Sequence, residues 1–590
     1  MITYRTEKNH MTFREQLTQK VKNAFTALGY DEKFGTVTVS NRPDLCQYQC
    51  NGALPAAKVY KKKPLDIASE VAEILKKDSM FSKAEACPPG FLNLSVSDEA
   101  LTDFVRGMTN KEKFGFEETK TPKTIVIDYG GANVAKSLHV GHLRSAIIGE
   151  TVKRILRYCG NTVIGDVHLG DWGLQMGIVI SGIIEQFGIE NLKTEEDRAK
   201  HITISVLEKT YPAKSKEAKE NEEVMAECKR VTFELQKGEG IYFDIWQKVL
   251  EVSKADLKRN YGRLGVTFDL WKGESDTRNV TGKMIEDLKA KGLAHTDDGA
   301  LVMDITREED NPPLPPFILE KSDGAVLYST TDLATILLRE KEINPDEIIY
   351  VVDNRQGTHF KQLFRAVEIS GLMKENLKLF FAGFGTMNGS DGKPYKTREG
   401  GVMRLEDLLN TLESEAYKKV EAAITSGEIT DDEMKEIARK VGIGALKFAD
   451  LSNHRSKDYV FDIDKFCSFE GKTGPYIQYS AVRIASILNK TDSTDGVILP
   501  PEGDIQRELF LFLTEFPYAV LQSAEDFAPN TLAEYIYQLA VLLNRYYHEY
   551  KVLSETDEEK KASRIATLSF ASKLLSQLLD LLGIEIPERM

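Results

Sequence analysis

The sequence predicts an α/β protein whose central domain is a doubly wound, Rossmann-type parallel sheet. Three observations support this prediction. Strands and helices alternate from residue 124 onward, a smaller α+β unit precedes them, and apolar-striped helices occupy the last part of the 590-residue chain. A chain of this length has room for about three to four domains. We place an N-terminal α+β domain at residues 1–115, the α/β domain at 120–450 and an all-α helical bundle at 451–590.

The composition is that of an ordinary globular protein, with 42% hydrophobic and 28% charged residues. A formal net charge of −14 argues against a protein that coats nucleic acid through bulk charge, but leaves open a local basic surface. No apolar run approaches the roughly 20 residues of a membrane span, and the N-terminus lacks a signal-peptide pattern. The six cysteines lack the spacing of a zinc set. We therefore expect a cytoplasmic protein with reduced thiols, no membrane contact and no structural metal.

The N-terminal domain is expected to begin with a helix over residues 11–30, where apolar residues recur at helical spacing. Short strands are expected at 37–40 and 91–96, with a second helix over 69–77. The polar segment 111–123 has the character of a linker.

The α/β domain opens with an apolar strand at 124–130, a helix at 142–158 and a strand at 161–167. This βαβ unit implies a parallel sheet, and Gly160 suits the C-terminal cap of the helix. The charge-rich stretch 190–260 indicates a helical insertion. Beyond about residue 430 the pattern is helical, which predicts a separate bundle. Further strands of this domain are expected at 299–305, 325–330, 346–353 and 377–384.

Two histidines, His139 and His142, stand around Gly141 where the first strand of the sheet gives way to a helix. Ligands of open parallel sheets bind beyond the carboxyl ends of strands, and a helix N-terminus attracts phosphate. Imidazoles at that point can donate hydrogen bonds to phosphate oxygens, and glycine allows close approach to the backbone. A metal pair, for which no third ligand is obvious, and a pair without a role are the alternatives.

The two histidines belong to longer sequence motifs that resemble those of a known protein family. HVGH resembles the HIGH signature of class I aminoacyl-tRNA synthetases, and its flanks resemble the arginyl-tRNA synthetases in particular. The matching segments are ANVAKSLHVGHLRS (132–145), HLGDWGLQMG (168–177), YGRLGVTFD (261–269), GES (273–275), KSDGAVLYSTTDLA (321–334), YVVDNRQGTHF (350–360), FGTMNGSDGKPYKTREGGVMRLEDLL (384–409) and FEGKTGPYIQYSAVRI (469–484). The resemblance covers residues 11 to 590. It implies a ligase for protein synthesis that uses ATP and Mg²⁺ to convert L-arginine to arginyl-adenylate, and then transfers it to the 3′ end of tRNA(Arg).

The second class I signature, KMSKS, is degenerate here, because loop 393–401 places Pro394 where the first lysine is expected. Enzymes of this family with such a loop are thought to rely on a lysine that flanks HIGH, and Lys136 fits that role. The resemblance implies the catalytic residues His139, His142, Lys136 and Lys396. It implies the ATP-binding residues His139, Gly141, His142, Lys393, Arg398 and His359.

A guanidinium has five donors in a planar fork, so a selective pocket needs carboxylates placed for bidentate pairing. Asp128 and Asp332 match the family's positions for this task, with Tyr328 as a pocket wall. Asn133 and Gln356 are expected to bind the amino-acid head. His168, Gly170 and Asp171 are expected to shape another wall, whereas Trp172 is expected to serve packing.

The helical bundle resembles the family's DALR-type anticodon-binding domain, and the first domain resembles its tRNA-elbow domain. Tyrosines one helical turn apart can stack on anticodon bases, although core tyrosines of a bundle are the alternative. The expected tRNA contacts are Tyr476, Tyr479, Arg483, Met590, Asn51 and Phe91. We expect a monomer that needs bound tRNA to activate arginine. A synthetase of another specificity and a catalytically dead RNA-binding relative are the rival interpretations.

Overall fold

The computed structural model describes residues 11–322, 324–393, 395, 403–423 and 429–590. Its contacts divide the chain into two compact units. One unit comprises Pro122–Ser468, and the other comprises Met1–Thr121 together with Phe469–Met590. No helix in the described part of the chain is long and apolar enough to cross a membrane.

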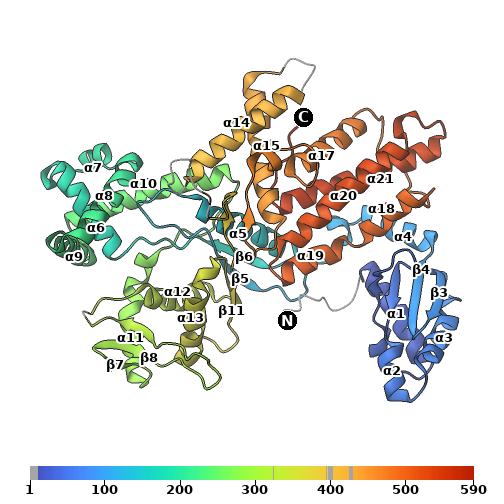
Figure 1. Cartoon of the computed structure of the whole chain (residues 1–590), viewed down its shortest axis with the longest axis horizontal. Coiled ribbons are helices and arrows are strands. Elements are labelled where there is room, and N and C mark those ends of the chain that lie inside the picture. The colour runs from blue at the N-terminus through green and yellow to red at the C-terminus, as the bar shows by residue number, and fades with distance from the viewer. Residues whose placement is uncertain (1–10, 323, 394, 396–402, 424–428) are drawn as a thin grey trace. The chain divides into compact units, whose positions relative to one another are not determined.

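The unit of residues 122–468 is built on a four-stranded sheet in the order β11-β10-β5-β6, in which every neighbouring pair is parallel (Figure 1). The order reverses direction between β5 and β10, which is the switch point at which doubly wound sheets bind ligands. This confirms the predicted fold class. The strands are β5 (Thr124–Asp128), β6 (Thr162–Asp166), β10 (Glu347–Tyr350) and β11 (Lys378–Phe381).

Helix α5 (Val140–Tyr158) follows β5 and is buried over most of its length. Gly160 adopts φ +91° just beyond its end, as the glycine cap predicts. The apolar runs of β5 and β10 lie between helices on both faces, so their side chains are buried whichever way they point.

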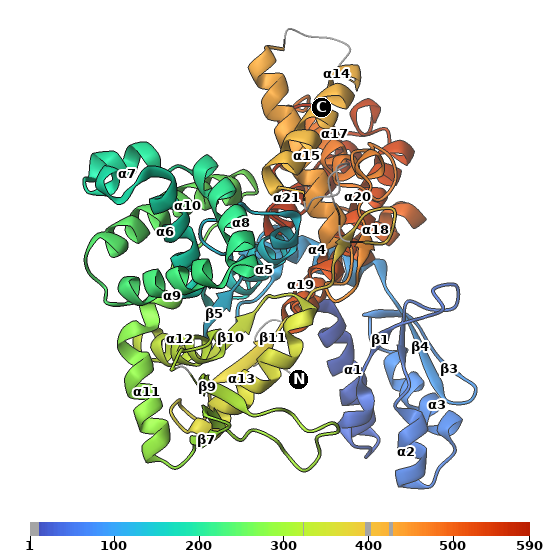
Figure 2. The same ribbon diagram turned by 60° about the vertical axis from the view of Figure 1, so that its left-hand side comes forward.

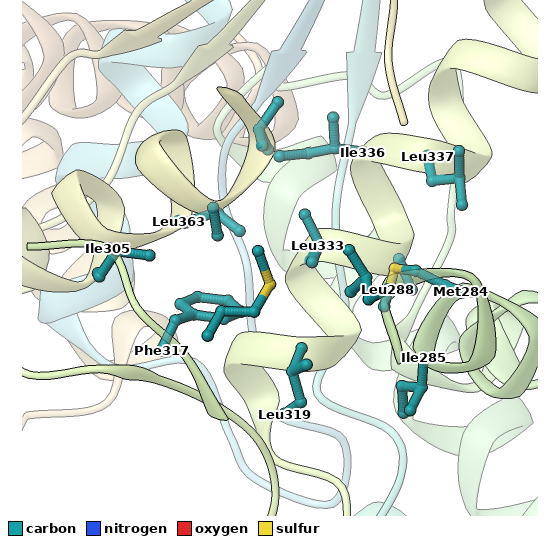
Figure 3. Packing of buried hydrophobic residues seen from close by; sticks show 14 of the residues in the cluster. Met284, Ile285, Leu288, Ile305, Phe317, Leu319, Leu333, Ile336, Leu337 and Leu363 are labelled. Atoms are coloured by element: carbon teal, nitrogen blue, oxygen red, sulfur yellow. The ribbon is translucent and has the colours of Figure 1, made fainter. Parts of the chain in front are cut away.

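Helix α12 (Tyr328–Ile343) is held by an apolar core on one of its faces (Figure 3). Leu333, Ile336 and Leu337 point into this core. An adjacent stripe carries Asp332 and Arg339, seven residues apart and therefore on one face. The packing partners of α12 are α11 (Arg278–Ala290), α13 (Gly357–Ser370) and β9 (Phe317–Glu320). The core therefore fixes the helix that presents these two polar residues.

Two of the expected strands differ in the structure. The strand expected at 325–330 is wrong, because α12 begins at Tyr328 and only Val326 forms an isolated bridge, to Glu320. The side-chain hydroxyls of Ser329 and Thr330 donate hydrogen bonds to backbone carbonyls of β9. These two residues therefore contact a strand although they belong to a helix. The segment 299–305 does contain β8, but β8 lies in a separate antiparallel sheet, β7-β8-β9. The first two strands of this antiparallel sheet are β7 (His295–Asp297) and β8 (Ala300–Met303).

The helical insertion predicted at 190–260 is present as α7 to α10, which gather with the preceding helix α6 in both views (Figures 1 and 2). They pack on one another, α6 against α8 and α9 most extensively. Their bounds are α6 (Leu174–Phe187), α7 (Glu195–His201), α8 (Ile204–Glu220), α9 (Glu222–Gln236) and α10 (Ile241–Arg263).

The compact unit continues beyond the expected domain boundary at residue 450. The short strand β13 pairs in parallel with β12, and buried Arg144 of α5 bonds both Asp450 and the carbonyl of Lys457. These contacts keep residues 452–468 with the sheet. The elements of this part are β12 (Met387–Asn388), α14 (Leu405–Ala423), α15 (Asp431–Leu451), β13 (Tyr459–Val460) and α16 (Ile463–Phe466).

The other unit contains the N-terminal α+β elements and the C-terminal bundle. Its antiparallel sheet has the order β1-β2-β4-β3. The N-terminal elements are α1 (Phe13–Ala27), β1 (Thr38–Val39), β2 (Tyr48–Cys50), α2 (Ala53–Tyr60), α3 (Pro64–Leu75), β3 (Phe81–Cys87), β4 (Phe91–Val96) and α4 (Asp98–Thr109). The bundle comprises α17 (Gly474–Leu488), α18 (Asp504–Thr514), α19 (Phe516–Glu525), α20 (Pro529–Glu549) and α21 (Glu558–Leu581).

Candidate functional site

The two histidines of HVGH form a capped start to α5. Nδ1 of His139 accepts the backbone N–H of Gly141 at 3.0 Å, and Nδ1 of His142 accepts the backbone N–H of His139 at 3.2 Å. The ring centroids lie 3.9 Å apart. Because each Nδ1 is an acceptor, a neutral ring carries its proton on Nε2.

Burial keeps both rings neutral. It lowers the pKa of His142 to about 3, with a further contribution from His139. Burial also lowers the pKa of His139, and the charges of Lys136 and Arg355 act in the same direction. Two uncharged imidazoles that can each donate from Nε2 therefore stand at the N-terminus of a helix, where anions bind.

A glycine is needed at position 141 because this residue lies directly against the His139 ring. A Cβ at this position would lie 2.7 Å from Cε1 of His139. The backbone after the second signature loop lies beside this turn, since Val140 N–H donates to Met403 O at 3.1 Å and Leu405 N–H donates to Leu138 O at 2.8 Å.

The second signature loop is described only in part. Lys393 is exposed at its start, whereas Lys396 and Arg398 lie outside the described residues. Lys136 is half-buried, and its ammonium lies 4.5 Å from the centroid of the Tyr211 ring. Lys136 precedes His139 by three residues, and its charge contributes to the lowered pKa of His139.

A second group of polar side chains comes from α12 and α13, the helices that precede and follow β10 in the chain. His359 Nε2, on α13, lies 2.7 Å from Asp332 Oδ2, on α12. The exposed ring of Tyr328 lies 5.0 Å from the His359 ring. His359, which the resemblance assigns to ATP, thus contacts the acid that the resemblance assigns to arginine.

Glu274 joins this cluster and was missed by the sequence analysis. Burial and the nearby carboxylates of Asp332 and Asp171 raise the pKa of Glu274 to about 8. A carboxyl group in this state favours a cation as its partner. Its GES motif gives no signal for this role, because the turn is placed by a contact more than a hundred residues away in the chain.

Asp171 provides that contact. Its carboxylate accepts the backbone N–H of Ser275 at 2.9 Å and the Ser275 hydroxyl at 2.7 Å. A Cβ at Gly273 would lie 2.6 Å from the same carboxylate, so the glycine allows the approach. Trp172 packs against Trp246, with ring centroids 5.3 Å apart, which agrees with its expected packing role.

Asp128 is buried at the end of β5 and already has a cationic partner within the chain. Nη2 of Arg339 donates to Asp128 Oδ2 at 2.6 Å and to Asp166 Oδ2 at 2.7 Å. The structure therefore gives Asp128 a partner that the sequence analysis did not foresee. Arg339, whose buried guanidinium lies between these two carboxylates, is two helical turns after Asp332 on the same face of α12.

The two residues expected to bind the amino-acid head are exposed. Asn133 follows β5, and a Cβ at Gly170 would lie 2.2 Å from its Oδ1, so Gly170 leaves space for this side chain. Gln356 occupies the N-cap position of α13, three residues before His359, and its side chain makes no capping hydrogen bond. His168 follows β6, and its Nε2 lies 3.5 Å from the Thr335 hydroxyl.

In the other unit, α17 and α20 form an aromatic and polar surface. Tyr479 is 42% exposed, whereas Tyr476 is half-buried and its hydroxyl accepts a hydrogen bond from Asn544 at 3.0 Å. Arg483 lies 4.8 Å from the centroid of the Tyr547 ring. Tyr547 and Asn544 were not identified from the sequence, because they come from the second helix of the surface.

The remaining expected tRNA contacts are placed as follows. Asn51 is exposed beside β2, and Phe91 is half-buried at the start of β4. Met590 is half-buried at the end of the chain.

Comparison with known families finds matches to three parts of the chain. The family described as tRNA synthetases class I (R), catalytic domain, matches residues 105–463. The DALR anticodon binding domain matches residues 477–590, and the arginyl tRNA synthetase N terminal domain matches residues 11–96.

Individual relatives agree with these assignments. The arginine–tRNA ligase of Alkaliphilus oremlandii is 50% identical over 98% of this chain and 99% of its own length, and that of Agathobacter rectalis is 47% identical over 97% and 99%. The arginyl-tRNA synthetase structure from Plasmodium falciparum has the same fold, with a TM-score of 0.82 at 24% identity, covering 99% of this chain and 100% of that one. The chain therefore belongs to the arginine–tRNA ligase family of class I tRNA synthetases.

Proposed function

We propose that the protein is an arginine–tRNA ligase, which activates L-arginine with ATP and transfers the arginyl group to the 3′ end of tRNA(Arg). The observation that supports this most is that two neutral imidazole donors follow the carboxyl end of β5, and that an acidic cluster of Asp171, Glu274 and Asp332 includes a residue that follows the neighbouring parallel strand β6. The first set suits phosphate and the second suits a guanidinium.

In the proposed first step, an oxygen of the arginine carboxylate attacks the α-phosphorus of ATP. The bond from that phosphorus to the bridging oxygen breaks, and pyrophosphate leaves. Nε2–H of His139 and of His142 would donate to phosphate oxygens as negative charge grows there, from rings fixed by their Nδ1 contacts. Lys136 would add a positive charge that the degenerate second signature lacks. In the second step the terminal ribose hydroxyl of tRNA attacks the adenylate carbonyl, and AMP leaves.

Arginine selectivity is proposed to come from Asp332 and Glu274. Burial and two nearby carboxylates raise the pKa of Glu274, and a bound guanidinium would supply a compensating cation. Asp128 would act with them through Arg339, which pairs with it and lies on the same face of α12 as Asp332. Lysine presents a point charge rather than a fork, so it would leave buried acceptors unpaired.

The other partners follow from the same assignment. The surface of Tyr479, Arg483 and Tyr547 is proposed to stack on and hold single-stranded anticodon bases. Among the described residues, no three His, Cys, Asp or Glu side chains are grouped to hold a metal ion. We therefore propose that Mg²⁺ enters bound to the phosphates of ATP. The monomeric state and the cytoplasmic location stay predictions.

Charging of bulk tRNA with each of the 20 labelled amino acids tests this function. Arginine alone should be charged, and Asp332→Asn should abolish charging while leaving the fold intact by thermal unfolding. Charging of another amino acid would contradict the proposed pocket. Binding of tRNA without charging would favour an RNA-binding relative that lacks catalysis.

A further inference from the structure

Three successive residues just upstream of HVGH are each held by the helical insertion. The backbone N–H of Ala135 donates to the hydroxyl of Ser253, on α10, at 3.1 Å. The ammonium of Lys136 faces the ring of Tyr211, on α8, and the hydroxyl of Ser137 donates to the carboxylate of Glu208, also on α8. Ala135 itself has φ +63°, a conformation that a non-glycine residue adopts only under constraint from its surroundings.

Glu208 and Tyr211 are three residues apart on α8, so they share one face of the helix. Glu208 also lies 3.3 Å from Nη2 of Arg404, whose backbone bridges to His139. The same helical face therefore contacts the segment before HVGH and the segment that follows the second signature loop.

The partner of the Lys136 ammonium determines whether this ammonium is available to a phosphate. Among the described residues, no carboxylate lies within ion-pairing distance of its ammonium, which instead faces an aromatic ring. A ring face attracts a cation through its quadrupole without supplying a negative charge. The ammonium is thereby held in place but keeps its full charge and its N–H donors for a phosphate. A carboxylate partner would hold it equally well and compete with the phosphate.

We propose that Tyr211 is a positioning residue for the activation step, which holds the Lys136 ammonium beside the histidine pair. The inference rests on the proposed role of Lys136 and assigns a catalytic purpose to helix α8 of the insertion. Tyr211 acts through the lysine and is not expected to touch a substrate. Its ring also packs against the apolar cluster of Ile178, Ala218 and Cys228, so the experiment must separate positioning from folding.

Pyrophosphate exchange with saturating arginine and tRNA, measured as a function of ATP, tests this proposal. Tyr211→Leu removes the ring face and keeps apolar bulk, whereas Tyr211→Phe keeps the ring. We expect Leu to lower kcat by roughly two- to thirty-fold, the range that corresponds to a lost cation–π contact, with a smaller change in KM for ATP. Phe should restore the rate. Tyr242→Leu is the matched control, because Tyr242 holds Arg230 elsewhere in the insertion by the same kind of contact.

A double-mutant cycle gives the decisive result. Once Lys136→Ala has removed the ammonium, Tyr211→Leu should cause no further loss of kcat, and arginine binding and the melting temperature should match those of Lys136→Ala. Equal, additive losses in both backgrounds would mean that Tyr211 serves only packing, and would overturn the proposal while leaving the role of Lys136 intact. A Lys136→Ala variant with full exchange would overturn both, yet tRNA charging with arginine would still support the ligase function.

Discussion

Binding of arginine should release a proton from Glu274. The carboxyl group of Glu274 has its pKa raised to about 8 by burial and by the charges of Asp332 and Asp171. A guanidinium placed beside it would favour the ionised form and lower that pKa. At neutral pH the free enzyme holds this proton, and the arginine complex does not.

The magnitude follows from the pKa. With a pKa of about 8, Glu274 is about 90% protonated at pH 7, so about 0.9 proton should leave for each arginine bound. The apparent dissociation constant should rise about ninefold between pH 7 and pH 6, which corresponds to about 1.3 kcal/mol. Binding should strengthen little above pH 8, where the carboxylate is already ionised. Arginine affinity therefore falls as the pH falls through the pKa of the free enzyme.

Titration calorimetry measures the proton count directly. The binding enthalpy of arginine is recorded at pH 7 in buffers of different ionisation enthalpy, and the slope gives the number of protons released. Glu274→Gln should bind arginine more weakly and bring the slope close to zero. Glu342→Gln, which removes an α12 carboxylate that pairs with Lys272, should leave the slope unchanged. A slope near zero in the wild-type protein, or one that survives in Glu274→Gln, would refute the reasoning.

Three further predictions concern other parts of the site and its surroundings. Arg339→Met leaves two buried carboxylates without a cation, so the free energy of unfolding measured with urea should fall by about 3–5 kcal/mol, and a loss under 1 kcal/mol would contradict the buried pair. Gly141→Ala forces the His139 ring from its place, so kcat for pyrophosphate exchange should fall by about a hundredfold with little change in arginine binding; an unchanged kcat would show that the ring position is unimportant. Tyr479→Ala should raise KM for tRNA by roughly five- to a hundredfold, whereas Tyr518→Ala, a similarly exposed tyrosine on α19, should not, and equal effects would argue against base stacking on α17.

The sequence predicts well what depends on neighbouring residues. The strand, the HVGH turn and the helix that follows it lie within about 35 residues, and their pattern places the histidine pair at the sheet edge without further information. The structure adds the direction of each ring, because the Nδ1 contacts depend on backbone geometry that no pattern reveals.

Most features of the site that could not be predicted from the sequence depend on pairs of residues far apart in the chain. Arg339 reaches Asp128 across 211 residues, and Asp171 places the Glu274 turn across 104. The segment at 325–330 was expected to be a strand because its residues favour strands, but α12 begins within it and its hydroxyls cap β9. Tertiary contacts outweigh local preference at these points, and they are also the points that shape the proposed arginine pocket.

The central claim is that a pocket of carboxylates selects a guanidinium and presents it to a phosphate site with neutral imidazole donors. Pyrophosphate exchange in the presence of bulk tRNA, measured with arginine and with citrulline, tests it most directly. Citrulline has nearly the shape of arginine but no positive charge. The account predicts exchange with arginine and a kcat/KM for citrulline lower by about 10⁴-fold or more. Comparable exchange with citrulline would contradict the claim, because a pocket that accepts the uncharged analogue does not use the carboxylates of Asp332 and Glu274 for selection.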